Sequence, residues 1–223
     1  MGQLYLVRHG QASFGAADYD KLSDVGIKQS ELLGEYFAQR NIRFDSIITG
    51  DMLRHKETAS GIQKGLSCGL AQEIDAGWNE FDFNAVVSAY LQVFPDQRPA
   101  SNAPRAAFYR LLKAAMLAWS KGELPGALPE TWEQFTGRVK QAVDNVCASE
   151  AKHVLVASSG GAIAITMMNM LDLSIDKTVN FNLQIKNTSV SHFYFNKDGI
   201  QLSSFNNVGH LDTPEHIPLI TYS

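Results

Sequence analysis

The sequence predicts an α/β protein: a three-layer α/β/α sandwich in which helices cover both faces of a mostly parallel sheet. Short apolar runs with strand character alternate along the chain with longer amphipathic stretches, which is the pattern of strand–helix–strand units. The chain has 223 residues, of which 45% are hydrophobic, so it can build one sizeable core. Ligands of such sheets bind outside the carboxyl ends of the strands. The residues that directly follow each predicted strand are therefore the first candidates for a functional site.

Strands and helices alternate through the first third of the chain. Apolar residues run continuously in the strands and recur every three to four positions in the helices. Ser23 precedes the first helix, where its hydroxyl can cap free backbone N–H groups, and Asp51 can begin the second helix. The predicted order is strand, helix, strand, helix and a short third strand, over residues 3–7, 24–39, 44–49, 51–64 and 72–75.

Residues 84–130 differ in character from what surrounds them. They hold five of the seven prolines and two helical stretches, near residues 85–93 and 104–119. We expect one domain over residues 1–223, with this segment as a helical cap inserted over its core.

The C-terminal part returns to the alternation of helices and strands. Large apolar residues recur at helical spacing through residues 130–147, which predicts a long amphipathic helix. An apolar strand over residues 153–157 leads through two glycines into a helix that ends near residue 170. The last stretch alternates and turns at Lys197-Asp198-Gly199, as a β-hairpin does.

Composition and charge exclude several classes of partner. The net charge is −4 with acidic and basic residues mixed, so no basic face for nucleic acid is expected, and an anion site must be a local pocket. Cys68 and Cys147 lie far apart in no metal-type spacing, and no basic-then-apolar signal region opens the chain, so a cytoplasmic location is expected. Apolar runs such as residues 162–168 are far shorter than the roughly 20 residues of a membrane span, so no membrane partner is expected.

The first strand ends in Arg8-His9-Gly10. The arginine side chain is a planar fork of N–H donors that suits phosphate. A neutral imidazole can attack phosphorus and form a phosphohistidine, which divides one difficult displacement into two easier steps. Three residues alone are equally compatible with a structural histidine and a surface arginine.

The stretch LVRHGQASFGAADYDKLSDVGIKQSELLG resembles the start of the histidine phosphatase superfamily, the phosphoglycerate mutase-like or branch-1 group, in which a strand ends in Arg-His-Gly. The stretches TGDMLRHKETA, NEFDF, VLVASSGGAI and NTSV…FNNVGHL continue this resemblance in the same order, so it covers nearly the whole chain. Gly50 and His55 depart from the serine and alanine that are usual in the second of these motifs. The resemblance implies a phosphoglycerate mutase-like fold.

The resemblance also implies a role for each matching residue. His9 is the nucleophile that takes the phosphoryl group, and Arg8 and Arg54 hold the non-bridging phosphoryl oxygens. Glu80 is the general acid that protonates the leaving group, a task that needs a raised pKa. Asp82, two residues further on, is the competing candidate for this acid.

No cofactor is expected. Family members need no metal, and no His, Cys and Asp residues stand at ligand spacing in this chain. The carbonyl of Gly10, or another backbone acceptor, can bind the proton of the His9 ring nitrogen that does not attack.

The second glycine-rich turn departs from the family at Ser159, which stands where the family has a second histidine that binds phosphate. A serine hydroxyl is neutral and shorter, and losing one preorganised donor typically costs about 10²–10³ in rate. Gly160 and Gly161 still allow backbone N–H groups and the positive end of the following helix to approach an anion, so Ser159 and Gly160 stay candidates for phosphate binding.

Four further residues remain open. His55 and His210 are candidates to replace the missing histidine, although a lone histidine is more often structural. Gln11 and Ser13 follow the predicted nucleophile and, like His55, are candidates for substrate contacts, while a capping role fits the first two equally well.

The function predicted from the sequence is hydrolysis of phosphate monoesters through a phosphohistidine on His9, with activity reduced by Ser159. The alternative is a catalytically weak or inactive protein that binds phosphate esters. The expected partner is a small-molecule phosphate ester, with inorganic phosphate or sulfate able to occupy the pocket, and the resemblance makes a homodimer an expectation.

Two less favoured hypotheses remain. A phosphoglycerate mutase would need inward-pointing basic residues in the insertion, which offers Arg98, Arg105, Arg110, Lys113 and Lys121. A serine hydrolase would use Ser159, whose turn is close to the G-x-S-x-G elbow, with Asp172 or Asp198 and then His210.

Overall fold

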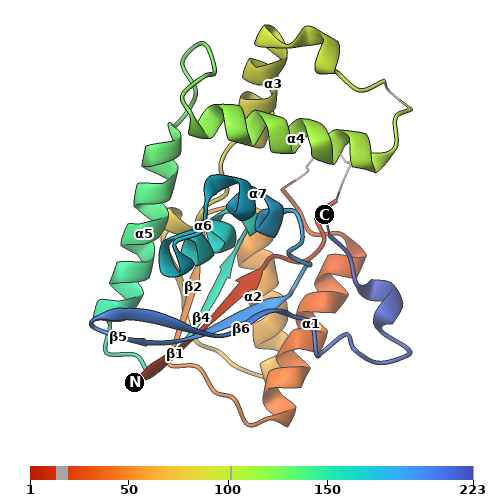
Figure 1. The fold of residues 1–223 in the computed structure, drawn as a ribbon. Helices are drawn as coiled ribbons and strands as arrows, with labels where there is room; N and C mark the ends of the chain where they lie inside the picture. Colours follow the sequence, from red (N-terminus) through yellow and green to blue (C-terminus); the bar gives the residue numbers. More distant parts are fainter. Residues whose placement is uncertain (14–19, 101, 223) are drawn as a thin grey trace.

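The computed structural model describes residues 1–13, 20–100 and 102–222. At its centre is a six-stranded sheet with the order β3-β2-β4-β1-β5-β6 (Figure 1). The pairs β3–β2, β2–β4 and β4–β1 are parallel, while β5 runs antiparallel to both β1 and β6. The strands span, in chain order, Gly2–Arg8, Ser46–Thr49, Gln72–Ile74, His153–Ser158, Val190–Asn196 and Gly199–Asn207. The predicted α/β fold is confirmed.

Helices cover both faces of this sheet, because the strands of its parallel part are apolar on both sides. In β1, Leu4 and Leu6 pack into one core cluster, whereas Tyr5 and Val7 pack into the other. The first cluster is completed by side chains of α5 (Trp132–Ala148) and α6 (Gly160–Leu171), and the second by those of α1 (Asp24–Gln39) and α2 (Leu53–Leu66). Because successive side chains of a strand point to opposite faces of the sheet, the sheet packs against helices on both sides, and three layers result.

A further set of helices lies above the carboxyl end of the sheet (Figure 1). Two of these helices, α3 (Phe83–Val93) and α4 (Arg105–Ser120), are called the cap helices below, and the third is α7 (Ile175–Asn182). Trp119 of α4 joins the cap to the core, since its ring contacts those of Phe81, Trp132 and Phe135 at centroid distances of 5.0 to 5.8 Å. The cap helices therefore cover the carboxyl ends of the strands.

Most predicted elements are confirmed within a few residues. The first helix has its predicted bounds, and the Ser23 hydroxyl accepts a hydrogen bond from the Gly26 N–H at 3.1 Å. The helix expected from Asp51 begins only at Leu53, because Asp51 lies in the preceding turn and pairs with Lys56. The hairpin turns as expected, between β5 and β6. Helix α7 was not predicted, since it is one short amphipathic segment within a polar stretch.

No helix in the described part of the chain combines the length and the apolar character that a membrane crossing requires.

Candidate active site

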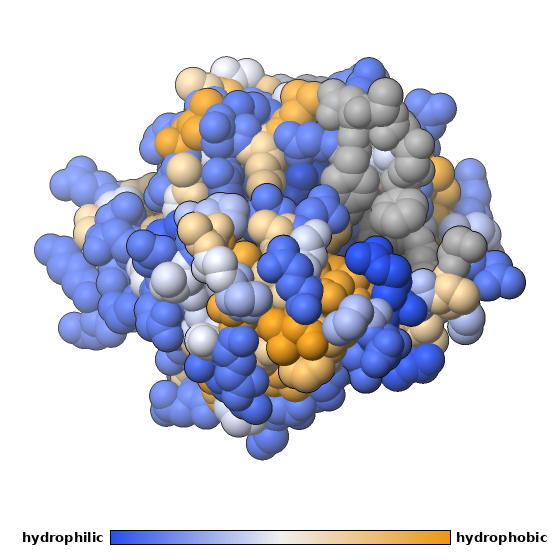
Figure 2. All heavy atoms as spheres, turned by 90° about the horizontal axis from the view of Figure 1, so that it is seen from above, coloured by the Kyte–Doolittle hydropathy of each residue, from blue (hydrophilic) through white to orange (hydrophobic). Residues whose placement is uncertain are grey.

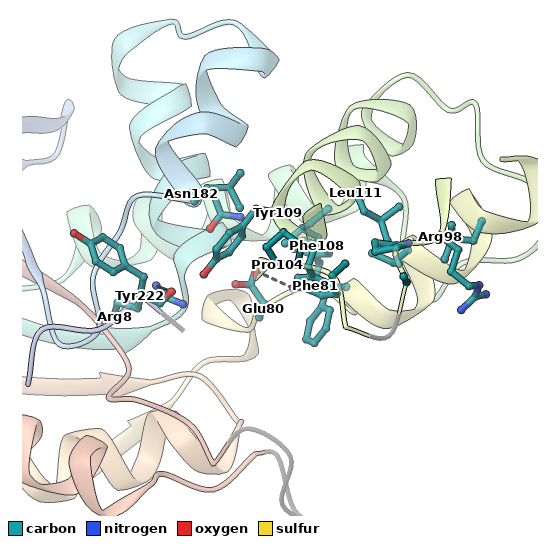
Figure 3. Close-up of a pocket in the computed structure, with 18 of the residues that line it drawn as sticks. Arg8, Glu80, Phe81, Arg98, Pro104, Phe108, Tyr109, Leu111, Asn182 and Tyr222 are labelled. Atoms are coloured by element: carbon teal, nitrogen blue, oxygen red, sulfur yellow. Dashed lines mark hydrogen bonds between the residues drawn. The ribbon is translucent and has the colours of Figure 1, made fainter. Parts of the chain in front are cut away.

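The ends of two central strands meet at one edge of the sheet. Arg8, the last residue of β1, pairs in register with Ser158, the last residue of β4, and the His9 N–H donates to the Ser158 carbonyl at 2.8 Å. A cavity of about 530 Å³ opens above this point. Its titratable lining near the sheet, called the floor below, consists of Arg8, His9, Arg54 and Glu80 (Figure 3 shows Arg8 and Glu80). The structure thus brings together four residues that lie up to 72 positions apart in the sequence.

His9 is held in one orientation. Its Nδ1 atom lies 2.7 Å from the Gly10 carbonyl oxygen, and because a carbonyl can only accept, Nδ1 carries the proton. The ring nitrogen Nε2 then keeps its lone pair. Burial, together with the positive charges of Arg54 and Arg8, holds the pKa of His9 well below its usual value. His9 is therefore neutral, and nucleophilic at Nε2, at neutral pH.

The two arginines are fixed by different parts of the chain. Arg8 donates through Nη1 to the backbone carbonyls of Ile185 and Tyr222, the second at 2.8 Å. Arg54 is 6% exposed and donates to the Asp20 carboxylate at 2.6 Å. Both guanidinium groups line the cavity, so two positive charges lie beside the His9 ring.

Glu80 lies in the loop before the cap, with its carboxylate at the cavity floor. Its oxygens accept from the N–H groups of Gly161 at 3.0 Å and of Phe81 at 3.2 Å. Burial raises the pKa of Glu80, although these N–H groups and the two arginines act in the opposite direction. A Cβ atom at position 161 would overlap the Glu80 carboxylate, so glycine is required for this approach. The raised pKa suits a proton donor.

Asp82, the competing candidate for the acid, does something else. It is exposed, lies outside the cavity lining and caps α3 by accepting from the Ala85 N–H at 2.9 Å. The local sequence explains this, because an aspartate directly before a helix satisfies a free backbone N–H group.

Ser159 does not reach the cavity. It is fully buried, and its hydroxyl lies 2.6 Å from the Nε2 atom of His55. Gly160 is also buried, and neither residue belongs to the described cavity lining, so the phosphate contacts of Ser159 and Gly160 stay predictions. The serine side chain is short and faces His55 instead.

His55 occupies the space behind the nucleophile. Its ring is fully buried and lies 5.8 Å from the His9 ring, measured between centroids. Burial and the nearby charge of Arg54 hold its pKa well below the usual value, so the ring is neutral. A Cβ atom at Gly50 would overlap the His55 ring, so this glycine makes room for the histidine. The His55 ring therefore contacts both Gly50 and Ser159, the other two positions at which the sequence predicts departures from the family pattern.

The other sequence candidates lie outside the cavity lining. The side chain of Gln11 accepts from the Ser23 hydroxyl at 2.9 Å, and the Ser13 hydroxyl donates to the Leu22 carbonyl at 3.0 Å. His210 is buried against the Thr188 hydroxyl at 2.8 Å, and burial lowers its pKa to about 3. Neither His55 nor His210 lines the cavity, so neither contacts a ligand there directly.

The serine hydrolase triad is not assembled. Ser159 is hydrogen-bonded to His55, while His210 pairs with Thr188, so the expected nucleophile and base do not meet. A fully buried serine hydroxyl also has no access to an ester in the cavity.

Sequence reasoning missed several lining residues. Asn182, at the end of α7, and Tyr109, from α4, lie beside the cavity in Figure 3, and Tyr222, close to the end of the chain, also lines it. No periodicity marks the tail or the unpredicted α7, and only tertiary packing brings them here.

This arrangement brings a neutral imidazole, two cations and a protonatable carboxyl group to one end of the cavity. Two fixed guanidinium groups stabilise the charge that spreads over a transferring phosphoryl group. Among the described residues, no three His, Cys, Asp or Glu side chains lie together as a metal site would require.

Comparison with known proteins gives relatives along the whole chain. The chain is 22% identical over 222 residues to putative phosphoserine phosphatase 2 of Hydrogenobacter thermophilus, covering 94% of this chain and 98% of that one. It is 24% identical over 199 residues to the probable phosphoglycerate mutase GpmB of Erwinia tasmaniensis, covering 86% and 84%.

A similar fold occurs in a solved structure of a phosphoserine phosphatase variant from Entamoeba histolytica in complex with phosphoserine. The TM-score is 0.66 and the identity 21%, and the match covers 95% of this chain and all of the other. Residues 4–208 also match the family described as the histidine phosphatase superfamily (branch 1). With its Arg-His-Gly strand end at the floor of the cavity, this chain belongs to the histidine phosphatase superfamily, branch 1.

Proposed function

We propose that this protein hydrolyses phosphate monoesters through a phosphohistidine on His9. The observation that carries the proposal is the orientation of His9, whose Nδ1 proton is bound by the Gly10 carbonyl so that Nε2 is free to attack. The names of the relatives, which include phosphatases and mutases, support phosphoryl chemistry.

The reaction has two steps. In the first, the Nε2 lone pair of His9 attacks phosphorus, the bond from phosphorus to the ester oxygen breaks, and Glu80 gives its proton to the departing oxygen. In the second, Glu80 takes a proton from water, the water oxygen attacks phosphorus, and the P–N bond breaks to restore neutral His9. Arg8 and Arg54 bind the non-bridging oxygens in both steps.

The starting charges agree with this sequence of events. Burial lowers the pKa of His9 and raises that of Glu80, so the same cavity favours an unprotonated base and a protonated acid. Pairs of groups whose pKa values are pushed apart in this way are typical of acid–base sites.

Binding without efficient turnover is the second candidate function. The observation that favours it is the lack of a second histidine at the floor, where Ser159 is turned toward His55. A mutase is less well supported, because Arg98 is the one basic residue of the insertion with a described side chain in the cavity lining.

Turnover of an aryl phosphate between about pH 5 and pH 8, without added metal, tests the proposal. We expect the wild type to be active and His9→Ala to be inactive. An inactive wild type that still binds inorganic phosphate would contradict hydrolysis and favour the binding function.

A gain-of-function variant separates the two candidates further. Ser159→His alone would collide with the His55 ring, which lies 2.6 Å from the serine hydroxyl. We therefore pair it with His55→Ala, which restores the family pattern at both positions. If the wild type is inactive and the double variant turns over the aryl phosphate, binding is supported as the native role. If the wild type is active and the double variant raises the turnover rate by less than about tenfold, hydrolysis is supported.

A further inference from the structure

The wall of the cavity differs from its floor. Above Glu80, the cap helices line the cavity with aliphatic and aromatic side chains, namely Phe83, Val87 and Leu91 from α3 and Phe108, Leu111 and Leu112 from α4. The described polar groups of this wall are neutral: the Tyr109 and Tyr222 hydroxyls and the Asn182 amide. The part of a ligand that extends away from His9 therefore meets mainly carbon.

Arg98 does not change this conclusion. It is exposed, and Figure 3 shows its guanidinium at the far end of the cavity, directed away from Glu80. Among the other basic residues of the insertion, Lys113 pairs with Asp176 at 3.2 Å and Arg110 lies outside the lining. Arg98 is thus the one cation of the insertion with a described side chain in the lining, and it stands at the far end of the cavity, away from Glu80.

The cap also leaves hydrophobic surface in contact with solvent. Phe108 lines the cavity and is 39% exposed, and a view from above the cap shows hydrophobic side chains gathered in one patch on a largely hydrophilic face (Figure 2). Exposed apolar surface beside a cavity marks a ligand site when the ligand can cover it.

We propose that the organic part of the substrate is apolar, an alkyl or aryl group that fills the cavity between α3 and α4. This inference rests on the proposed hydrolysis at His9, which places the phosphoryl group at the floor. A cavity of about 530 Å³ is within the range of sites for drug-sized ligands. Phosphoserine and phosphoglycerate carry a carboxylate on a very short carbon chain, which this wall would desolvate without pairing it.

A series of n-alkyl phosphates from ethyl to octyl tests the proposal on the wild type. The leaving alcohols are chemically alike, so the series varies apolar area and leaves the bond that breaks unchanged. We expect kcat/KM to rise about two- to fourfold with each added methylene until the cavity is full. Phosphoserine and 3-phosphoglycerate should be no better than the ethyl ester. A flat series, or phosphoserine as the best substrate, would overturn the proposal.

Two matched variants test whether the dependence of kcat/KM on chain length arises at this wall. Phe108→Ser changes a phenylalanine of the cavity lining, whereas Phe94→Ser changes one of similar exposure, 43%, outside the lining. Phe108→Ser should flatten the dependence on chain length, and Phe94→Ser should keep it. Equal slopes in both variants would contradict binding of the chain at this wall.

Failure of the proposed hydrolysis can be distinguished from failure of the inference about the apolar substrate. Absence of turnover on every ester would contradict the phosphatase, and calorimetric titration of the same esters would still test the apolar preference. Affinity that increases with chain length supports the inference, and equal affinity for ethyl and octyl phosphate overturns it.

Discussion

The floor and the wall of the cavity are built by opposite means. The side chains of the floor are fixed by hydrogen bonds to backbone or to a carboxylate, as His9 is by Gly10 and Glu80 by Gly161. The wall consists mainly of aliphatic and aromatic side chains from the cap helices, and the polar groups beside them are neutral apart from Arg98 at its outer end. The comparison teaches that the floor is preorganised for one reaction, while the wall selects by apolar area. Changes to the floor should therefore affect kcat, and changes to the wall should affect the choice of substrate.

The largest effect should come from the nucleophile. His9→Ala removes the proposed nucleophile, so we expect kcat for an aryl phosphate to fall by at least about a thousandfold. Affinity for octyl phosphate, measured by calorimetry, should change much less because the wall is intact. Turnover by His9→Ala at a rate close to that of the wild type would contradict the role proposed for His9.

The next effect should come from the acid. Glu80→Gln keeps the shape of the side chain but removes its titratable proton, so we expect kcat to fall by about 10²–10⁴. The pH profile gives a second readout. Because the pKa of Glu80 is raised, wild-type activity should extend above the normal carboxyl range and fall once Glu80 loses its proton. On the acid side, the lowered pKa of His9 should keep activity below the normal histidine range.

Asp82→Asn is the matched control for the acid, since Asp82 is two residues away and caps a helix outside the cavity. Asparagine caps helices as well as aspartate does, so activity, pH profile and stability should stay close to the wild type. A loss in Asp82→Asn as large as that in Glu80→Gln would mean that the acid is assigned to the wrong carboxylate.

A smaller effect on rate is expected behind the floor. Gly50→Ala places a methyl group against the His55 ring, so we expect a loss of roughly 1–3 kcal/mol in the free energy of unfolding and a modest fall in kcat. Denaturant unfolding measures the first quantity. The loss should become smaller when Gly50→Ala is combined with His55→Ala, while the Asn79 Oδ1 atom, 2.7 Å from the added carbon, still opposes it. An equal loss in both backgrounds would contradict the contact with His55.

The smallest effect should come from Arg98 at the outer end of the wall. Its guanidinium is exposed and points away from the floor, so Arg98→Ala should change kcat/KM for octyl phosphate by less than about twofold. The same variant should leave 3-phosphoglycerate a poor substrate. A loss of tenfold or more on that anionic ester alone would mean that the wall does bind a second anion.

The sequence predicts the floor better than the wall, for physical reasons. Arg8 and His9 stand at the end of the first strand, where such sheets bind ligands, and the resemblance to the family adds Arg54 and Glu80. The alternation of Tyr5 and Leu6 between two cores likewise follows from the period of a strand.

The wall depends on packing that no local pattern encodes. The helical segments of the cap were predicted, but their orientation, which brings Phe108 to the cavity, is fixed by contacts such as the Trp119 ring cluster. The pairing of His55 with Ser159 joins residues 104 positions apart, so the sequence treats them separately and only the structure shows their contact.

Direct detection of the phosphoenzyme is the most decisive measurement. The wild type and His9→Ala are mixed with an aryl phosphate and quenched within milliseconds in alkali, in which phosphohistidine survives, and the modified residue is located by mass spectrometry. The account predicts one phosphoryl group on His9 in the wild type and none in His9→Ala. Turnover without a phosphoenzyme, or a phosphoryl group on another residue such as Ser159, would contradict it.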